Sequence, residues 1–194
     1  MWQVDWEIDR EAYAAELRRF AAEPAGHRPL VFAGDSLTAW SHFDTRIPGA
    51  VLRGIPGDQA DLLRDRLTEI VARTPSQLFL MIGLNDLQRH HPPAQVADDI
   101  AASIDFIRTH SPATRIILQS VLPSTSPELQ AQIVALNPRL RQLAAARAQT
   151  WLDLHAQFLQ PNGRIRPGLI QPDHVHLTEA AYDAWLLALQ PLLP

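Results

Sequence analysis

The chain has 194 residues, 46% of them apolar and 20% charged, which predicts one globular domain over residues 1–194 with a full-sized core. A formal net charge of -4 and the lack of any run of Lys or Arg argue against a nucleic-acid partner and a membrane-surface helix, so we expect a small-molecule partner. No cysteine is present, which excludes disulfides, a thiolate nucleophile and a Cys-based zinc site. Chemistry must therefore use Ser, His, Asp and Glu.

The N-terminal region, residues 1–26, predicts a helical lead-in to the domain. Residues 9–22 carry apolar positions at helical spacing among charges, and Pro24 and Gly26 end this pattern. The first seven residues lack the basic start and the apolar run of a secretory signal. No apolar stretch approaches the roughly 20 residues that cross a bilayer. We expect a cytoplasmic protein without membrane insertion.

Short apolar runs along the rest of the chain predict five buried strands, at residues 29–33, 51–55, 77–82, 115–122 and 151–154. Helical patterns lie between and after them, at about 58–73, 93–109, 127–148 and 179–189. Thr178 is a plausible N-cap of the last helix, and Pro138 is expected to kink or split the helix at 127–148. Alternating strands and helices predict an α/β protein, a three-layer α/β/α sandwich around a parallel sheet.

Four segments that follow predicted strands or precede the last helix are polar or rich in glycine. They are Gly34-Asp35-Ser36-Leu37-Thr38, Gly54-Ile55-Pro56-Gly57-Asp58, Gly83-Leu84-Asn85-Asp86 and Asp173-His174-Val175-His176. Ligands of open parallel sheets bind beyond the carboxyl ends of the strands. We therefore expect these segments to converge on one edge of the sheet.

The residue types in these segments are those that acyl transfer to a serine requires. A hydroxyl is a weak nucleophile, so Ser36 needs a neutral imidazole to take its proton, and that imidazole needs an acceptor for its other N–H. His176 and Asp173 could supply both, because their spacing of three lets the two side chains lie on one side of a turn. The backbone N–H groups of Ser36 and Gly57 and the amide of Asn85 are candidate oxyanion donors.

In order along the chain, Gly34-Asp35-Ser36-Leu37, Gly57-Asp58, Gly83-Leu84-Asn85-Asp86 and Asp173-x-x-His176 resemble the four sequence blocks of the SGNH (GDSL) hydrolase superfamily. The resemblance implies a serine esterase that needs no cofactor, with a triad of Ser36, His176 and Asp173. It also implies an oxyanion hole formed by the Ser36 amide, Gly57 and Asn85. The implied fold is flavodoxin-like, with five parallel strands in the order 2-1-3-4-5.

Within the superfamily, residues 53–58, 80–87 and 119–123 are most similar to bacterial enzymes that resemble platelet-activating-factor acetylhydrolase subunits. Such relatives imply short acyl groups, often acetyl. Pro56 departs from the pattern, because relatives commonly carry Ser or Gly there, and it should stiffen the loop. The Gly-x-Ser-x-Gly elbow is absent since Thr38 replaces its second glycine, which argues against the α/β-hydrolase fold.

Each of these residues also has a structural interpretation. Taken alone, Ser36 fits a helix cap, Asn85 a turn residue and Gly57 a simple positive-φ position. Their joint occurrence favours the functional interpretation. We interpret Asp35 and Asp86 as acceptors that brace their loops.

Metal binding is the minority interpretation of the histidines. His174 and His176 have a His-x-His spacing, but no third ligand stands at a telling distance in the sequence. The pair His90-His91, followed by Pro92, is more typical of an exposed helix entry. We therefore predict no metal.

The sequence also offers candidates for the substrate pocket. Trp40, His42, Leu122 and Pro123 are candidates to line it, although Trp40 fits ordinary core equally well. The expected substrate is a small ester. An acyl thioesterase with the same triad, or a non-catalytic flavodoxin-like module that binds phosphate at residues 34–38, are the alternatives. The sequence leaves the oligomeric state open, with a homo-oligomer as one possibility.

Overall fold

The computed structural model describes residues 9–24 and 29–194, and they form a five-stranded parallel sheet with the order β2-β1-β3-β4-β5. This confirms the order implied by the sequence resemblance. The strands are β1 (Leu30–Gly34), β2 (Ala50–Gly54), β3 (Gln77–Met81), β4 (Arg115–Gln119) and β5 (Thr150–Leu152). In register, Gly34 at the end of β1 lies between Gly54 of β2 and Met81 of β3.

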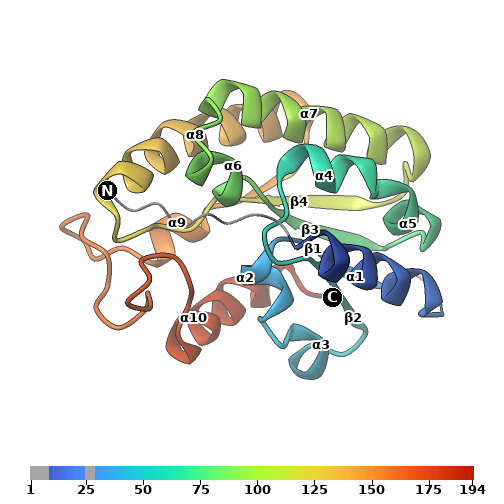
Figure 1. The fold of residues 1–194 in the computed structure, drawn as a ribbon, viewed down its shortest axis with the longest axis horizontal. Coiled ribbons are helices and arrows are strands. Elements are labelled where there is room, and N and C mark those ends of the chain that lie inside the picture. Colours follow the sequence, from blue (N-terminus) through green and yellow to red (C-terminus); the bar gives the residue numbers. More distant parts are fainter. Residues whose placement is uncertain (1–8, 25–28) are drawn as a thin grey trace.

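Helices cover both faces of the sheet and complete the three layers (Figure 1). One face carries α4 (Ala60–Asp65), α5 (Leu67–Ala72), α6 (Leu84–Gln88), α7 (Pro93–His110) and α8 (Pro127–Ala146). The other carries α10 (Glu179–Leu189) with the short helices α2 (Ser36–Ala39) and α3 (Phe43–Arg46). The remaining elements are α1 (Arg10–Ala22), α9 (Leu154–Gln157) and a terminal 3-10 turn, η1 (Gln190–Leu192).

Strand β1 and residues 78–81 of β3 are apolar and buried, because helices pack on both of their sides. Every residue of β1 is buried, and the rings of Phe32 and Phe79 stack with centroids 4.5 Å apart. Phe43 of α3 packs against Phe32 and, edge to face at 5.2 Å, against Trp185 of α10. This aromatic cluster joins α3 and α10 to the sheet directly beneath the polar strand ends.

The structure differs from two of the predictions about helices. The pattern at 58–73 forms two helices, α4 and α5, separated at Arg66, whose side chain turns back under the strand ends. Helix α8 is not split at Pro138. Proline removes the N–H that would bond the carbonyl of Val134, and both residues are exposed, so water can hydrogen-bond that carbonyl. The Thr178 N-cap is confirmed, since its side chain accepts from the Ala181 amide.

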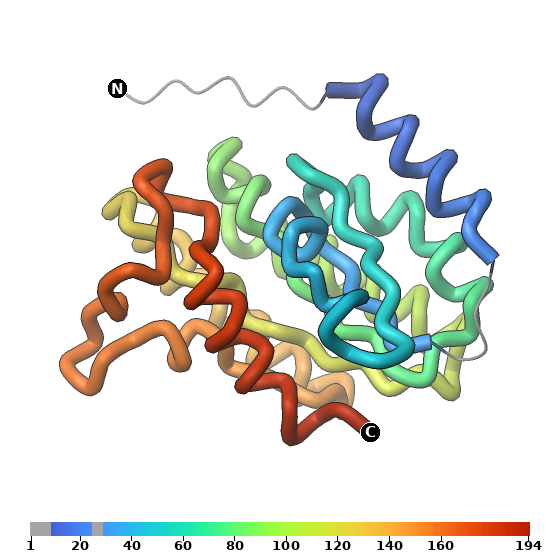
Figure 2. The backbone as a smooth tube through the Cα atoms, turned by 90° about the horizontal axis from the view of Figure 1, so that it is seen from below, coloured from blue at the N-terminus to red at the C-terminus, as the bar shows by residue number. Residues whose placement is uncertain are grey.

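Helix α1 lies beside the β2 edge of the sheet, on the flank that also carries α4 and α5 (Figure 2). It ends near the predicted stop, with Asp9 as N-cap and Glu23 as C-cap. Residues 1–8 and 25–26 of the predicted lead-in lie outside the described residues. No helix among the described residues is both long and apolar enough to span a bilayer.

Candidate active site

Ser36 is the first residue of α2, directly beyond the carboxyl end of β1. Asp35 caps this helix by accepting a hydrogen bond from the Leu37 amide at 3.0 Å, which is the bracing role expected of it. The turn is tight: a Cβ on Gly54 would lie 2.4 Å from the Ala39 nitrogen, and one on Gly34 only 2.2 Å from the Met81 carbonyl oxygen. Glycine at both strand ends therefore lets α2 sit directly on the sheet.

The loop before α10 brings His176 and Asp173 to Ser36. The Ser36 hydroxyl lies 3.2 Å from Nε2 of His176, and Nδ1 of the same ring lies 2.7 Å from a carboxylate oxygen of Asp173. The other oxygen of Asp173 accepts from the amides of Val175 and His176. Although desolvation opposes them, these hydrogen bonds hold the pKa of Asp173 below its ordinary value. The carboxylate is thus charged where it meets the imidazole.

The loop between β4 and α8 braces this acid–base pair from behind. Ser124, which is buried, donates from its hydroxyl to the carbonyl oxygen of His174 at 2.7 Å, and the Thr125 amide reaches the same carbonyl at 3.3 Å. The Thr125 hydroxyl lies 2.7 Å from Nδ1 of His174. These contacts hold His174, which is one of the two residues between Asp173 and His176 and has a left-handed backbone with φ of 72°. His174 therefore anchors the loop that carries Asp173 and His176.

Three N–H donors converge beside the serine. The Ser36 amide is the first of its helix and has no acceptor within it. Gly57 has φ of 80°, a conformation that glycine adopts without strain, and within the described part of the chain no group accepts from its amide. The Asn85 amide donates one hydrogen to the Asp58 carbonyl at 2.9 Å and has a second one to offer. The arrangement suits an oxyanion.

A buried ion pair that the sequence did not indicate holds this donor loop. Arg66 donates to the carboxylate of Asp58 at 2.6 and 2.9 Å, and to the carbonyls of Gly34 and Arg53 at the ends of β1 and β2. Burial raises the pKa of Asp58, and the Arg66 guanidinium opposes that rise. Asp58 is fully buried. The pair therefore ties two strand ends to the loop that carries Gly57.

Two more buried carboxylates lie around the same loop. Asp86 accepts from the Ala60 amide at the start of α4, and burial raises its pKa to about 6. Asp86 thus braces its surroundings, as expected. Burial, helped by the negative charges of Asp58 and Asp86, raises the pKa of Asp35 to about 7. Asp35, Asp58 and Asp86 thus form an acidic floor of the site, and Arg66 pairs with one of them, Asp58.

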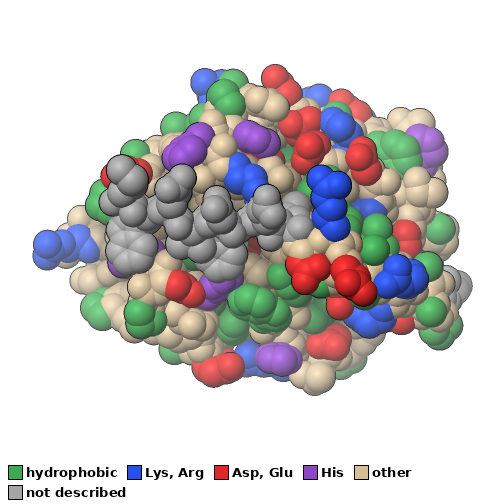
Figure 3. Space-filling model, viewed as in Figure 1, with side chains coloured by type: hydrophobic (Ala, Val, Ile, Leu, Met, Phe, Trp, Pro, Cys, Tyr) green, Lys and Arg blue, Asp and Glu red, His purple; other side chains and the backbone are tan. Residues whose placement is uncertain are grey.

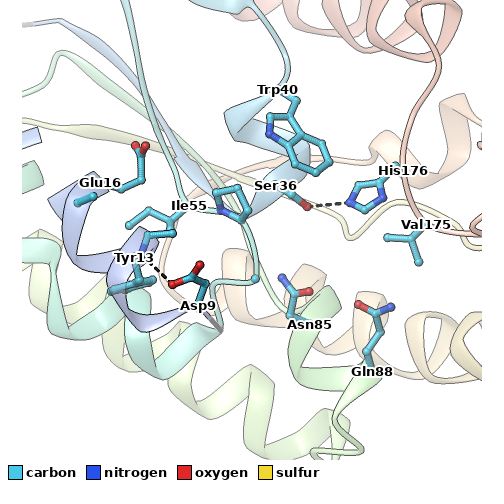
Figure 4. Close-up of a pocket in the computed structure, with 14 residues that line it drawn as sticks. Asp9, Tyr13, Glu16, Ser36, Trp40, Ile55, Asn85, Gln88, Val175 and His176 are labelled. Carbon is cyan, nitrogen blue, oxygen red and sulfur yellow. Dashed lines mark hydrogen bonds between the residues drawn. The ribbon is translucent and has the colours of Figure 1, made fainter. Parts of the chain in front are cut away.

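A cavity of about 430 Å³ opens over Ser36 (Figure 4). Trp40 lines it, 46% exposed, with its ring centroid 4.7 Å from that of His176. Three residues that the sequence suggested for the pocket, His42, Leu122 and Pro123, are not part of the lining of this cavity. Leu122 and Pro123 are buried, Leu122 in the hydrophobic core, whereas His42 is exposed at the start of α3.

Helix α1 supplies a wall of this cavity that the sequence did not reveal. Its contributing residues are Asp9, Ala12, Tyr13, Ala15 and Glu16, and the rest of the lining includes Ile55, Pro56 and Gln88. The recurrence at positions 9, 12, 13 and 16 marks one helix face. That spacing is visible in the sequence, but only the docked helix shows what the face meets.

His90 and His91 lie outside the loop that carries Asp173 and His176. His90 is exposed and lies beyond the end of α6, with φ of 63°, and His91 follows it just before α7. In the described ranges, no three His, Asp or Glu side chains come close enough together to hold a metal ion.

The chain belongs to the GDSL-like lipase/acylhydrolase family, whose model matches residues 26–184. It is a carboxylic ester hydrolase, and a Ser-His-Asp triad with an oxyanion hole is typical of this family. A search of the curated proteins finds no match.

Solved structures share the fold. A protein from Streptococcus pneumoniae, provisionally designated a platelet activating factor, is 23% identical with a TM-score of 0.84, over 95% of this chain and 94% of that chain. A GDSL-like lipase from Bacteroides thetaiotaomicron is 22% identical with a TM-score of 0.78, over 95% of this chain and 96% of that chain. A lipase/acylhydrolase from Enterococcus faecalis is 22% identical with a TM-score of 0.69, over 87% of this chain and 98% of that chain.

Proposed function

We propose that this protein hydrolyses carboxylic esters of short, acetyl-like acyl groups through an acyl-Ser36 intermediate. The observation that carries the proposal is the unbroken chain of contacts from the Ser36 hydroxyl through both ring nitrogens of His176 to the carboxylate of Asp173. Each contact is at hydrogen-bond distance, as general base catalysis requires. The substrate is a small-molecule ester, and the reaction needs no cofactor.

In the acylation step, Nε2 of His176 takes the proton of the Ser36 hydroxyl while the serine oxygen bonds to the ester carbonyl carbon. The carbonyl oxygen becomes an oxyanion. As the tetrahedral intermediate collapses, the bond to the alcohol oxygen breaks, and His176 gives its proton to that oxygen. Asp173 holds the ring in the orientation that presents Nε2 and stabilises the imidazolium.

In the deacylation step, His176 takes a proton from a water molecule, whose oxygen attacks the acyl carbon. The second tetrahedral intermediate collapses, the bond to Ser36 breaks, and the proton returns to the serine oxygen. The products are a carboxylic acid and regenerated enzyme. The same three side chains therefore serve both halves of the reaction.

The oxyanion of both intermediates is expected to lie between the amides of Ser36 and Gly57 and the side chain of Asn85. Such a donor typically contributes about 3 kcal/mol of barrier lowering when it is fixed in advance. The contact from Asn85 to the Asp58 carbonyl and the ion pair beneath it supply that rigidity. Because Gly57 has no side chain, the carbonyl oxygen of the substrate can approach its backbone closely.

The decisive measurement compares wild type with Ser36→Ala in the hydrolysis of p-nitrophenyl acetate. We expect kcat to fall by about 10⁴-fold or more with an unchanged unfolding temperature. Ser76→Ala is the matched control, because Ser76 lies at the opposite end of the sheet, beside Pro29. Full activity in Ser36→Ala would overturn the assignment of the nucleophile.

Labelling and a substrate pair separate the remaining alternatives. A fluorophosphonate probe should modify Ser36 in wild type and not in His176→Ala; failure to label wild type would favour the phosphate-binding module. Acetyl esters and thioesters with matched leaving groups test ester against thioester preference. A higher kcat/KM for the thioester would replace the esterase proposal by a thioesterase one.

A further inference from the structure

The cavity over Ser36 has two ends of different character. Figure 4 shows His176 and Val175 on one side of Ser36, and Tyr13, Asp9 and Glu16 of helix α1 on the other. Ile55 lies between Ser36 and α1, and the adjacent Pro56 also lines the cavity. The cavity volume of about 430 Å³ falls in the range of roughly 300–1,000 Å³ that holds drug-sized ligands, so it exceeds what an acetyl group fills.

Side chains fix the α1 wall to the body of the protein. The Tyr13 hydroxyl lies 3.2 Å from the Asp58 carboxylate and 3.4 Å from the Leu62 carbonyl oxygen. At the other end of the helix, Phe20 is buried, and the Arg73 guanidinium donates to its carbonyl at 2.6 Å. The Arg53 guanidinium lies 4.5 Å from the centre of the Phe20 ring. The wall is therefore anchored along its length.

The carboxylates of this wall are already engaged. Asp9 caps α1 by accepting from the amides of Glu11 and Ala12, and Glu16 pairs with Arg19 at 2.7 Å. The cavity therefore meets mainly small and apolar parts of the helix. Ala12 and Ala15 are both exposed to it, and each ends at Cβ.

The proposed reaction decides which part of a substrate faces α1. His176 must protonate the leaving oxygen, so the alcohol lies on the His176 side of the tetrahedral carbon. The oxyanion points to Gly57 and Asn85. The acyl chain takes the remaining direction, past Ile55 and Pro56 toward the helix.

We infer that the acyl group of the substrate lies between the β2–α4 loop and helix α1, and that Ala12 and Ala15 set the longest acyl chain accepted. The inference rests on the proposed esterase function, because it places that substrate's acyl group. It extends the substrate class from acetyl to uncharged aliphatic acyl groups up to about hexanoyl, which bury more apolar surface against the wall. Helix α1 is then a specificity element.

The test measures kcat/KM for p-nitrophenyl acetate, butyrate and hexanoate, a series with a constant leaving group. In wild type, butyrate and hexanoate should match or exceed acetate. Ala12→Trp should lower the ratio of hexanoate to acetate by at least about tenfold, because the indole takes the space of the distal methylenes. Ala21→Trp is the matched control: Ala21 is exposed on the same helix and outside the cavity lining, so its profile should equal that of wild type.

A second series varies the alcohol, with methyl, butyl and hexyl acetate. Its profile should be the same in wild type and Ala12→Trp. An unchanged acyl profile, or a loss confined to the longer alcohols, would overturn the inference and assign the α1 end to the leaving group. If Ala12→Trp does not fold, Ala15→Leu makes the same test with a smaller change. Absence of all ester turnover in wild type would instead contradict the proposed function itself.

Discussion

The site is assembled from two regions that are built in different ways. The proposed nucleophile and oxyanion donors lie just beyond the ends of β1, β2 and β3, supported by Arg66 and by Asp58, which is 0% exposed. The acid–base pair lies on a loop, where the Asp173 side chain is 41% exposed and the His176 side chain 12%. Hydrogen bonds from Ser124 and Thr125 hold this loop, and its apolar residues Val175 and Leu177 pack into the core.

The difference predicts how each region responds to mutation. Buried charges that lose a partner cost several kcal/mol of folding free energy, whereas exposed groups cost little. Substitutions in the strand-end region should therefore lower stability and activity together. Substitutions in the acid–base loop should lower activity at nearly constant stability. Charged side chains of both signs are mixed over the described part of the face in Figure 3, and they offer exposed controls.

The largest effect is expected for Asp173→Asn. The amide still accepts from the backbone, but it no longer stabilises the imidazolium or the required tautomer, so kcat should fall by about 10⁴-fold. The unfolding temperature should change little. Steady-state kinetics and thermal unfolding measure both, with Asp44→Asn on exposed α3 as control. A large loss of stability in Asp173→Asn would contradict the proposed difference between the two regions.

Arg66→Leu should give the opposite pattern. Asp58 becomes a buried carboxylate without its cation, and the expected loss is about 3–5 kcal/mol of unfolding free energy. Urea unfolding measures it, and kcat should fall as the Gly57 loop loosens. Arg64→Leu, in the last turn of α4 and with a partly exposed ion pair to Asp99, should cost no more than about 1 kcal/mol. Adding Asp58→Asn to Arg66→Leu should recover part of the loss; no recovery would contradict the pairing.

Asp35→Asn tests the acidic floor through pH. Burial raises the pKa of Asp35 from 3.8 to about 7, so between these values the folded protein binds the proton that the unfolded chain has lost. Wild-type stability therefore falls as pH rises through this window. The variant removes the charge and keeps the cap, so its advantage should grow from near zero below the window to the order of a few kcal/mol above it. Urea unfolding across pH would show a constant difference if Asp35 did not titrate there.

The smallest effect is expected for Ser124→Ala. The variant removes the hydroxyl that holds the His174 carbonyl, although the Thr125 amide still reaches it. A loss of about 1 kcal/mol in stability and a fall in kcat of up to about tenfold should follow. Ser126→Ala is the control, because its side chain makes no cap hydrogen bond. A decrease in kcat as large as that of Asp173→Asn would mean that the loop is held by this one contact.

The three-layer architecture was predictable because each strand and helix is encoded by the apolar pattern of its own segment. The meeting of Ser36, Asp173 and His176 was predictable because parallel strands end on one edge and the motifs appear in a recognisable order. The break at Arg66 was not, since a helical pattern does not show that a charged side chain will be pulled under the sheet. Nor was the continuity of α8 at Pro138, because it depends on which side of the helix meets water.

Cavity walls were the weakest part of the prediction for a related reason. Leu122 follows a strand and was expected in the pocket, yet its side chain turns into the core. Helix α1 precedes every strand and was expected only as a lead-in, yet it forms a wall. Such contacts join residues far apart in sequence, and no local pattern encodes them.

The distance of 140 positions between Ser36 and His176 also has a meaning during synthesis. Chains emerge from the ribosome N-terminal end first. A nascent chain that has reached only the end of α8 carries its nucleophile and all three oxyanion donors, but neither the base nor its carboxylate partner. On the proposed mechanism, unfinished or prematurely terminated products cannot activate Ser36, and ester hydrolysis begins only after the loop before α10 has been made and docked.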